Sequence, residues 1–322
     1  MKVPMLLPLI VIVALVCAPA AEATCQRWCG GVEIPYPFGI GRGCYRRSPG
    51  FGDDQQDFEV KCSNRTGKSP IPMVYDFEVI RIDVRRGQLR VRSPVSSWCY
   101  DFASRTMGEA VPVSYESTAF RVSDADNVLA VVGCNALAFI GSQEGDVDNR
   151  HVVGCHAACP GGRRFIAGDG SPCNGTGGCC QMAIPPGIRS FDLSFVDSYN
   201  ISGDVAEFNP CSYAMVVDRE AFKFRTSYVT TRELLHVAGG QVPAVLDWAV
   251  GNETCEVATW NRTTYACVSD HSKCVNSVNG PGYLCNCSQG YQGNPYVPGG
   301  CKGQCYFLPP LLVLEIITFV RL

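Results

Sequence analysis

The sequence predicts a mainly β, disulfide-rich protein built from several extracellular modules. Short segments in which apolar and polar residues alternate, such as Phe58 to Cys62 and Val74 to Val84, lie between turns rich in glycine and proline. Between Cys25 and about Ile140, no amphipathic helix longer than two turns is evident. The 322 residues include 20 cysteines, and such a content is typical of secreted chains held together by disulfides.

Residues 1–23 predict a secretory signal peptide. Lys2 gives the charged start, an apolar run follows, and Ala21-Glu22-Ala23 has the small residues of a cleavage site. Cleavage removes Cys17, so an odd number of cysteines remains and one thiol is expected to stay unpaired. Export also permits glycosylation at Asn-x-Ser/Thr sequences, and the predicted acceptors are Asn64, Asn174, Asn200, Asn252 and Asn261. A sixth such sequence, at Asn286, is doubtful because its middle residue is Cys287.

The segment from Cys25 to Cys44 reads CQRWCGGVEIPYPFGIGRGC. Two prolines fix their own φ angles and favour extended residues before them, and three glycines permit bends, so a rigid, disulfide-pinned β-edge is expected. The full pattern resembles the opening of the galacturonan-binding extracellular domain of plant wall-associated receptor kinases. The resemblance implies a galacturonan-binding-like β module over residues 24–140. We expect Cys25, Cys29, Cys44, Cys62, Cys99 and Cys134 to staple it.

An arginine-rich hairpin is predicted inside this module. In the run RIDVRRGQLRVR, apolar residues alternate with charged ones on both sides of an Arg86-Gly87 turn. The alternation predicts arginines on one exposed face, and these are Arg81, Arg85, Arg90 and Arg92. Arg42, Arg46 and Arg47 could extend that face, while Tyr36, Tyr45 and Trp98 could offer flat surfaces to sugar rings. Two interpretations remain open: a solvated edge that deters aggregation, or a carboxylate-binding surface, since a guanidinium can bind a uronate bidentately.

Residues 141–250 are predicted to form a second cysteine-rich module of the wall-associated type. It contains GCHAAC and CNGTGGCC, which are similar to runs that follow the galacturonan-binding region in wall-associated kinases. His151, His156, Cys155 and Cys159 also permit a zinc interpretation. Disulfides are favoured in an exported chain, so no metal site is predicted.

Residues 251–302 carry the spacing C-x11-C-x6-C-x10-C-x-C-x13-C. This pattern resembles an epidermal-growth-factor-like repeat of the wall-associated type, called the EGF-like repeat below. The resemblance pairs Cys255 with Cys274, Cys267 with Cys285, and Cys287 with Cys301. Calcium is not expected, because the residues before Cys255 only partly match the calcium-binding subtype.

The resemblance stops after Cys301, and residues 303–322 form a divergent apolar tail. No kinase motif follows, so the sequence predicts a relative without the kinase. Pro309, Pro310 and Glu315 oppose a membrane helix, and the stretch free of proline is shorter than a span needs. We therefore expect a secreted protein of the cell wall, with Cys305 as the unpaired thiol. Attachment to the plasma membrane by the tail stays open as the alternative.

The sequence thus predicts non-catalytic binding of a pectic polysaccharide, de-esterified homogalacturonan, within residues 24–140. The alternative is a protein-binding decoy or co-receptor that acts through the EGF-like repeat with other extracellular proteins. Glycoside hydrolysis would need two carboxylates across a sugar site, and neither Asp53-Asp54-Asp57 nor Asp124-Asp126 is marked as such a pair. No cofactor and no nucleic-acid partner are expected.

Overall fold

The computed structural model describes residues 25–47, 58–63, 67, 69–116, 119–141, 153–199 and 201–303. Several sequence predictions lie outside the described residues. These are the signal peptide, the glycosylation acceptors Asn64 and Asn200, His151, the acidic run Asp53-Asp54-Asp57, and the tail from residue 304 onward with Cys305.

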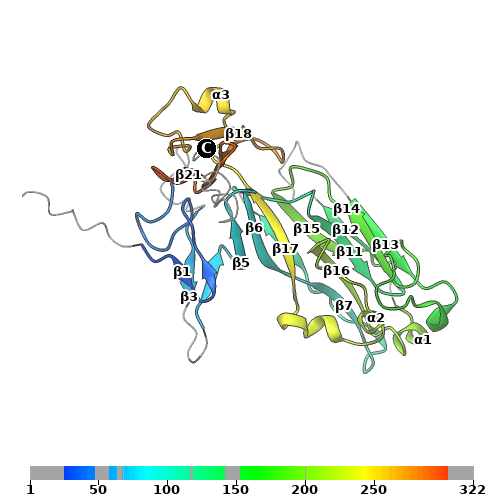
Figure 1. Ribbon diagram of the computed structural model, residues 1–322. Coiled ribbons are helices and arrows are strands. Elements are labelled where there is room, and N and C mark those ends of the chain that lie inside the picture. Colours follow the sequence, from blue (N-terminus) through cyan, green and yellow to red (C-terminus); the bar gives the residue numbers. More distant parts are fainter. Residues whose placement is uncertain are drawn as a thin grey trace, which may run out of the picture.

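Three antiparallel sheets form the long body of the protein (Figure 1). The six-stranded sheet has the order β10 (Phe120–Val122), β17 (Gln241–Trp248), β6 (Gln88–Pro94), β5 (Phe77–Asp83), β4 (Ile71–Val74) and β3 (Lys61–Ser63). The five-stranded sheet has the order β14 (Cys179–Ala183), β11 (Asn127–Val132), β16 (Cys211–Asp218), β7 (Ser96–Asp101) and β8 (Thr106–Met107). The four-stranded sheet has the order β13 (Val153–Ala158), β12 (Asn135–Gly141), β15 (Ser190–Phe195) and β9 (Val113–Glu116). The mainly β, disulfide-rich class predicted from the sequence is thereby confirmed.

Three smaller two-stranded sheets lie outside the body. They pair β1 (Trp28–Cys29) with β2 (Val32–Glu33), β18 (Ser272–Asn276) with β19 (Tyr283–Cys287), and β20 (Tyr291–Gly293) with β21 (Cys301–Gly303). The first belongs to the opening segment, where Pro35 and Pro37 follow β2 and the peptide bond between Tyr36 and Pro37 is cis. The other two form the EGF-like repeat at the top of Figure 1.

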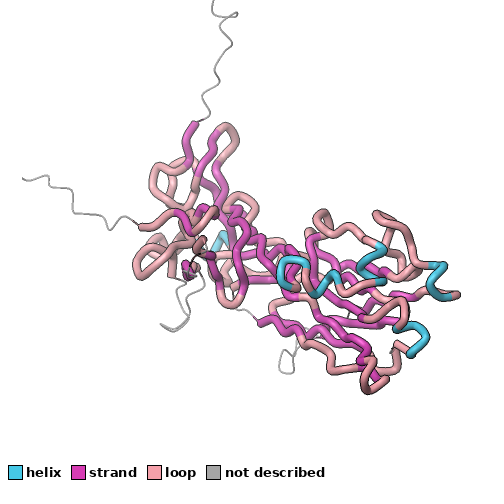
Figure 2. The backbone as a smooth tube through the Cα atoms, turned by 90° about the horizontal axis from the view of Figure 1, so that it is seen from below, coloured by secondary structure: helices cyan, strands magenta, loops and turns pink. Residues whose placement is uncertain are grey.

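The described helices are all short, and all of them lie after residue 161. They are α1 (Gly203–Ala206), α2 (Thr226–Thr230), α3 (Cys255–Ala258), η1 (Gly162–Phe165), η2 (Glu233–Leu235) and η3 (Val237–Gly239). α1 and α2 lie at the end of the body far from the EGF-like repeat (Figure 1, Figure 2). Among the described residues, no helix combines the length and the apolar character that a membrane crossing requires.

The body combines strands from both sides of residue 140, where the sequence suggested a boundary between two modules. β17 pairs with β6, β16 pairs with β7, and β15 pairs with β9. Disulfides cross the same position: Cys99 joins Cys211, and Cys134 joins Cys159. The expectation that Cys99 and Cys134 staple residues 24–140 internally is therefore wrong, because their partners, Cys211 and Cys159, lie in the later part of the chain.

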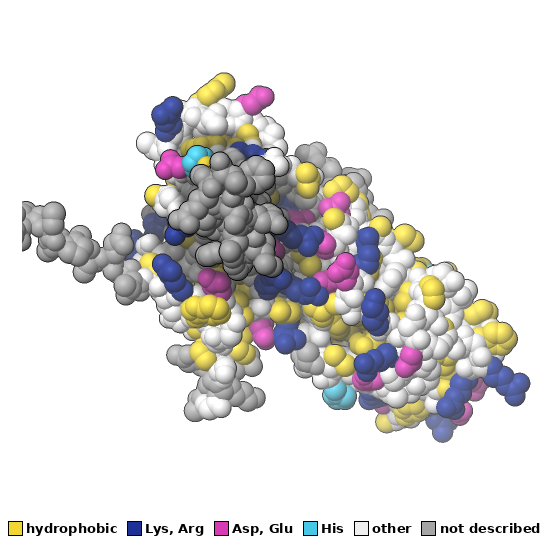
Figure 3. Space-filling view, viewed as in Figure 1, with side chains coloured by type: hydrophobic (Ala, Val, Ile, Leu, Met, Phe, Trp, Pro, Cys, Tyr) yellow, Lys and Arg dark blue, Asp and Glu magenta, His cyan; other side chains and the backbone are white. Residues whose placement is uncertain are grey.

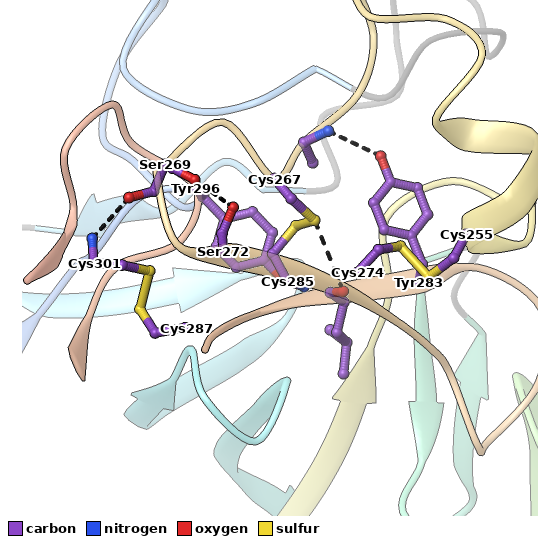
Figure 4. Close-up of a disulfide and its surroundings, with 12 residues drawn as sticks. Cys255, Cys267, Ser269, Ser272, Cys274, Tyr283, Cys285, Cys287, Tyr296 and Cys301 are labelled. Carbon is purple, nitrogen blue, oxygen red and sulfur yellow. Dashed lines mark hydrogen bonds between the residues drawn. A yellow bond between two sulfur atoms is a disulfide. The ribbon is translucent and has the colours of Figure 1, made fainter. Parts of the chain in front are cut away.

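All eighteen cysteines of the described residues are in disulfides. The opening segment is held by Cys25–Cys44 and Cys29–Cys62. Cys155–Cys180 and Cys173–Cys179 complete the bridges of the body. The EGF-like repeat has Cys255–Cys274, Cys267–Cys285 and Cys287–Cys301 (Figure 4), which are the pairs that its resemblance implied.

An aromatic cluster joins the opening segment, the six-stranded sheet and the EGF-like repeat. Trp248 at the end of β17 is 1% exposed, and its ring centroid lies 5.4 Å from that of Phe38 and 5.5 Å from that of Phe58. On its other side the centroid of Tyr296 lies 5.6 Å away. Edge-to-face contacts of this kind add about 0.5–1.5 kcal/mol each beyond the burial of apolar area. One tryptophan thus packs against three segments that are distant in sequence.

Asn279 fixes the EGF-like repeat to the body by hydrogen bonds. Its side chain is buried; Oδ1 accepts from the Gly187 N–H at 2.6 Å. Its Nδ2 donates to the carbonyl of Val122 at 3.0 Å and to Oδ2 of Asp247 at 2.9 Å. Every polar atom of this side chain is therefore satisfied by the body, so the repeat has a defined orientation on it.

We predict that Asn279→Ala lowers the free energy of unfolding by about 2–4 kcal/mol, since each buried group left without a partner costs roughly 1–3 kcal/mol. Val278→Ala is the matched control, because Val278 is 97% exposed in the same loop and surface changes usually stay within ~0.5 kcal/mol. Urea unfolding of both variants without reductant measures the difference. Equal stabilities would show that Asn279 does not hold the repeat.

Candidate functional site

A basic groove lies between the β5–β6 hairpin and the EGF-like repeat. It has a volume of about 630 Å³, which is in the ~300–1,000 Å³ range of small-ligand sites. The hairpin lines it with Arg81, Asp83, Arg85 and Arg86, and the repeat lines it with Lys273, Asn286, Cys287, Gln289, Tyr291, Gln292, Gly293 and Pro295. Four side chains are basic and one is acidic. Figure 3 shows Lys and Arg side chains, mixed with Asp and Glu, over the sheets on this face of the molecule.

β5 and β6 form the hairpin that the alternation predicts, but its turn covers residues 84–87 rather than Arg86-Gly87 alone, so Arg85 lies in the turn. Arg81 lies opposite Arg90, and Asp83 lies opposite Gln88, with a register shift between Val79 and Arg81. The turn ends at Gly87, which has a φ of 66°, a left-handed conformation that glycine adopts without strain. A Cβ on Gly87 would also lie 2.6 Å from Cδ1 of Leu284 in the EGF-like repeat. A larger residue here would need both a left-handed backbone and a shift of the Leu284 side chain, so glycine favours this close approach.

The predicted arginines separate into two groups. Arg81 is 72% exposed and lies in the groove with Arg85, which is also exposed. Arg90 and Arg92 are half-buried and form ion pairs with carboxylates of the body. Arg81 and Arg90 lie opposite each other and so share a face of the hairpin, as expected. The expectation that this face is fully exposed is wrong for Arg90 and Arg92, because both are half-buried beside acidic side chains that the sequence alone did not place there.

Arg90 contacts the deepest of these carboxylates. Its Nη2 lies 2.6 Å from Oδ2 of Asp218, whose side chain is 6% exposed. Asp218 Oδ1 also accepts the backbone N–H groups of Glu220 and Ala221. Arg90 thus neutralises a nearly buried charge in β16, which is a structural role.

Arg42, Arg46 and Arg47 lie outside the groove. Arg42 and Arg47 are exposed. Arg46 is half-buried, and its Nη2 donates to the carbonyl of Thr264 in the EGF-like repeat. Arg46 therefore helps to dock the repeat rather than extending a surface for ligand.

The sugar-stacking candidates are mostly in the core. Tyr45 and Trp98 are 7% and 8% exposed, and Nε1 of Trp98 donates to the carbonyl of Gly108. Tyr36 is half-buried and lines a separate cavity of about 450 Å³ beside Asn294. The aromatic ring in the basic groove is Tyr291, which the sequence analysis did not select.

The structure also adds Arg86, Lys273 and Asn286 to the groove. Arg86 was assigned only to the turn, while Lys273 and Asn286 lie in a part of the chain that the sequence treated as a separate module. Only the tertiary structure shows that these residues belong to the groove. The pairing of β18 with β19 places Lys273 opposite Asn286, and the docking of the repeat brings both to the hairpin. Sequence spacing could not show this proximity.

The basic side chains of the groove differ in how they are neutralised. Nη2 of Arg81 lies 3.1 Å from Oδ2 of Asp83, and Nη2 of Arg86 lies 3.1 Å from Oδ1 of Asp126. Among the described residues, neither Arg85 nor Lys273 takes part in an ion pair. These two cations are therefore the ones most available to an anionic ligand.

A polar network supports the hairpin from beneath. Nε2 of Gln88 donates to Oδ2 of Asp126 at 2.6 Å and to Oδ1 of Asp247 at 2.9 Å. Asp247 also accepts from Asn279 of the EGF-like repeat. Burial raises the pKa of Asp247, and the hydrogen bonds from Asn279 and Gln88 only partly oppose this effect. The groove and the repeat thus share one set of hydrogen bonds.

The metal and glycosylation candidates lie elsewhere. Cys155 and Cys159, proposed above as alternative zinc ligands, are bonded to Cys180 and Cys134. Within the described part of the chain, no group of three His, Cys, Asp or Glu residues gathers to hold a metal. The acceptors Asn174, Asn252 and Asn261 are exposed and do not line the groove, so glycans there would not fill it.

We predict that Asp247 makes folding less favourable as pH rises. Because its folded-state pKa lies above the unfolded value, its contribution is fully present below about pH 4 and is lost as pH increases through the raised pKa. The melting temperature of the unmodified chain should therefore fall relative to that of Asp247→Asn between about pH 4 and pH 7. A difference that stays constant over this range would contradict the assignment.

We further predict that Arg90→Ala lowers the free energy of unfolding by about 1–3 kcal/mol, because Asp218 would keep a buried charge without its cation. Arg85→Ala, at an exposed position in the same hairpin, should cost less than ~0.5 kcal/mol. Thermal unfolding of both variants distinguishes the two roles. Equal losses would mean that the ion pair with Asp218 contributes nothing.

Parts of the chain are similar to a known family and to known proteins. Residues 25–93 match the family described as wall-associated receptor kinase galacturonan-binding. The chain is 33% identical over 279 residues to wall-associated receptor kinase 5 of Arabidopsis thaliana, covering 86% of this chain and 34% of that protein. It is 33% identical over 289 residues to wall-associated receptor kinase 1, with the same coverage. Wall-associated receptor kinase-like 10 is 26% identical over 330 residues, covering 87% of this chain and 39% of the relative.

The chain spans about a third of the length of the wall-associated receptor kinases that it matches. No solved structure shows significant similarity to it. The matched family covers the opening segment and both strands of the arginine hairpin, and the relatives match through most of the described body. Residues 25–93 are therefore similar to the wall-associated receptor kinase galacturonan-binding family, within a chain that is similar over most of its length to the wall-associated receptor kinases.

Proposed function

We propose that this protein binds acidic cell-wall polysaccharide, specifically de-esterified homogalacturonan, in the basic groove. The observation that carries the proposal is the excess of four basic side chains over one acidic side chain in a single cavity. Three of the four, Arg81, Arg85 and Arg86, lie within the segment that matches a galacturonan-binding family. A wall polymer with one carboxylate on each sugar fits a groove of this charge.

The chemistry of the hairpin suits a uronate. A guanidinium presents five N–H donors in a planar fork, which can bind both oxygens of one carboxylate. Arg85 is exposed and not engaged in an ion pair among the described residues. Arg81 and Arg86 contact acidic side chains through Nη2 but stay 72% and 61% exposed. Each side chain therefore keeps donors on its solvent side for a second anion.

Charge recognition gives selectivity for the de-esterified polymer. Methyl esterification removes the negative charge and leaves an ester that accepts hydrogen bonds only weakly, so the ion-assisted contact is lost. The same contacts are screened by salt over about 8–10 Å at ordinary ionic strength. Affinity should therefore depend on both esterification and ionic strength.

Binding without catalysis is part of the proposal. Glycoside hydrolysis needs two carboxyl groups about 5–10 Å apart across the sugar. Of the described residues that line the groove, only Asp83 is acidic, and its carboxylate already accepts from Arg81 and from the Arg86 backbone N–H. We place the protein outside the cell, in the wall, because its disulfide content suits an oxidising compartment and its relatives are wall-associated.

We predict that the purified chain binds de-esterified oligogalacturonide and loses most of this affinity for the fully methyl-esterified oligomer of the same length. Affinity for the de-esterified form should fall steadily as NaCl is raised, because opposite charges attract less strongly when screened. Isothermal titration calorimetry with both oligomers provides the measurement. Equal affinity for the two would rule out charge recognition.

Substitution locates the site. Arg85→Ala should weaken binding of the de-esterified oligomer about three- to tenfold, the equivalent of losing one exposed charge-assisted contact of roughly 1 kcal/mol. The matched control is Arg262→Ala, since Arg262 is exposed on the EGF-like repeat but does not line the groove. If Arg262→Ala weakens binding and Arg85→Ala does not, the ligand lies elsewhere.

A further inference from the structure

We propose that the EGF-like repeat supplies the second wall of the binding groove, and that Lys273 on this wall binds a carboxylate of the same uronate chain. The inference rests on the proposed function and extends it to a part of the chain outside the matched domain family. It makes the binding site a composite of two segments separated by almost two hundred residues of sequence.

Contacts between the two walls hold them at a fixed separation. Leu284 of β19 packs over Gly87 at the hairpin turn. Asn286, also in β19, has its side-chain amide 3.1 Å from the carbonyl of Arg85, and it donates there in the amide orientation that satisfies both of its polar atoms. The opposite strand of the repeat bears Lys273. The repeat is thus bonded to the residue that carries the most available arginine of the groove.

Lys273 is placed beside this contact by strand register. It pairs with Asn286 across the β18–β19 sheet, and side chains of directly opposite residues lie on the same face. Both residues line the groove. Lys273 is exposed, and among the described residues it has no ion-pair partner. Its ammonium group therefore faces the same solvent-filled space as the Arg85 guanidinium.

Two cations on facing walls favour a ligand with several negative charges. Without an anion between them, their mutual repulsion is relieved only by solvent and salt. A carboxylate-bearing chain lowers this repulsion at both walls, whereas a neutral chain does not. The composite groove therefore selects a run of uronates over a neutral polysaccharide.

The wall formed by the repeat also offers an apolar ring. Tyr291 lines the groove, and its ring stacks on His271 with centroids 3.9 Å apart and planes inclined by 14°. The stack covers one face of the tyrosine and holds its orientation. A flat apolar surface beside cations matches a uronic acid, which combines a carboxylate with C–H bonds on the faces of its ring.

The composite site changes where the binding activity should reside. The sequence placed it within residues 24–140, a range that contains the hairpin but not Lys273. Because the repeat and the body share Asn279, Gln88 and the Trp248 cluster, the test is made on the full chain with single substitutions.

The experiment titrates de-esterified oligogalacturonide into Lys273→Ala, Lys273→Glu and Lys273→Arg. We expect affinity about three- to tenfold weaker for the alanine variant, a larger loss for the glutamate variant, and near-complete retention for the arginine variant, which keeps the positive charge. Lys302→Ala and Lys302→Glu are matched controls, since Lys302 is an exposed lysine of the same repeat that does not line the groove. Melting temperatures should be unchanged in all five variants.

The outcomes separate this inference from the proposed function. If the unmodified chain does not bind the oligomer, the proposed function fails and the inference fails with it. If the chain binds, Arg85→Ala weakens binding and Lys273→Glu does not, the proposed function stands and the composite groove is wrong. If Lys273→Glu and Lys302→Glu weaken binding equally, the repeat acts through its overall charge and the specific role of Lys273 is overturned.

Discussion

The packing around Trp248 is the constraint on which the arrangement of this protein depends. The indole contacts three aromatic rings: Phe38 of the opening segment, Phe58, and Tyr296 of the EGF-like repeat. The centroid of each of these rings lies within 5.6 Å of the Trp248 centroid. Trp248 lies at the end of β17, which pairs with β6 of the hairpin and with β10. One buried ring thus ties the six-stranded sheet to both of its attachments.

The polar contacts at the same junction fix the orientation of the EGF-like repeat on the body. Dispersion and burial of apolar surface hold the EGF-like repeat against the sheet, but these forces are not directional. Asn279, Asp247 and Gln88 require matched donors and acceptors, so the repeat docks in one orientation. That orientation brings Lys273 and Tyr291 to the hairpin. The basic groove is a consequence of the docking, because neither wall forms a cavity of this composition alone.

The basic side chains of the hairpin and the groove have different roles, although most of them come from one arginine-rich run of the sequence. Arg90 compensates the nearly buried Asp218, and the partly exposed Arg92 contacts Glu78 at 2.9 Å. Arg81 and Arg86 are partly neutralised at the rim. Arg85 and Lys273 keep their charges available. A surface with only unpaired cations would repel itself, so carboxylates from β16 and from the segment before β11 stabilise the hairpin while the rim stays basic.

Sequence by itself determined the strands, the turn at Gly87, the cysteine-rich class and the pairing of β5 with β6, because alternation and turn chemistry act between near neighbours. Only the tertiary structure decided that β17 joins the hairpin sheet, that Cys99 pairs with Cys211, and that Arg90 faces Asp218. These outcomes depend on which distant strands bury their apolar faces together. The alternation of apolar and polar residues within a strand does not indicate which other strand it will pair with. Lys273 shows most clearly what the sequence could not predict. The cysteine spacing around it indicates only a strand of an EGF-like repeat, and its place in the groove comes from the packing around Trp248.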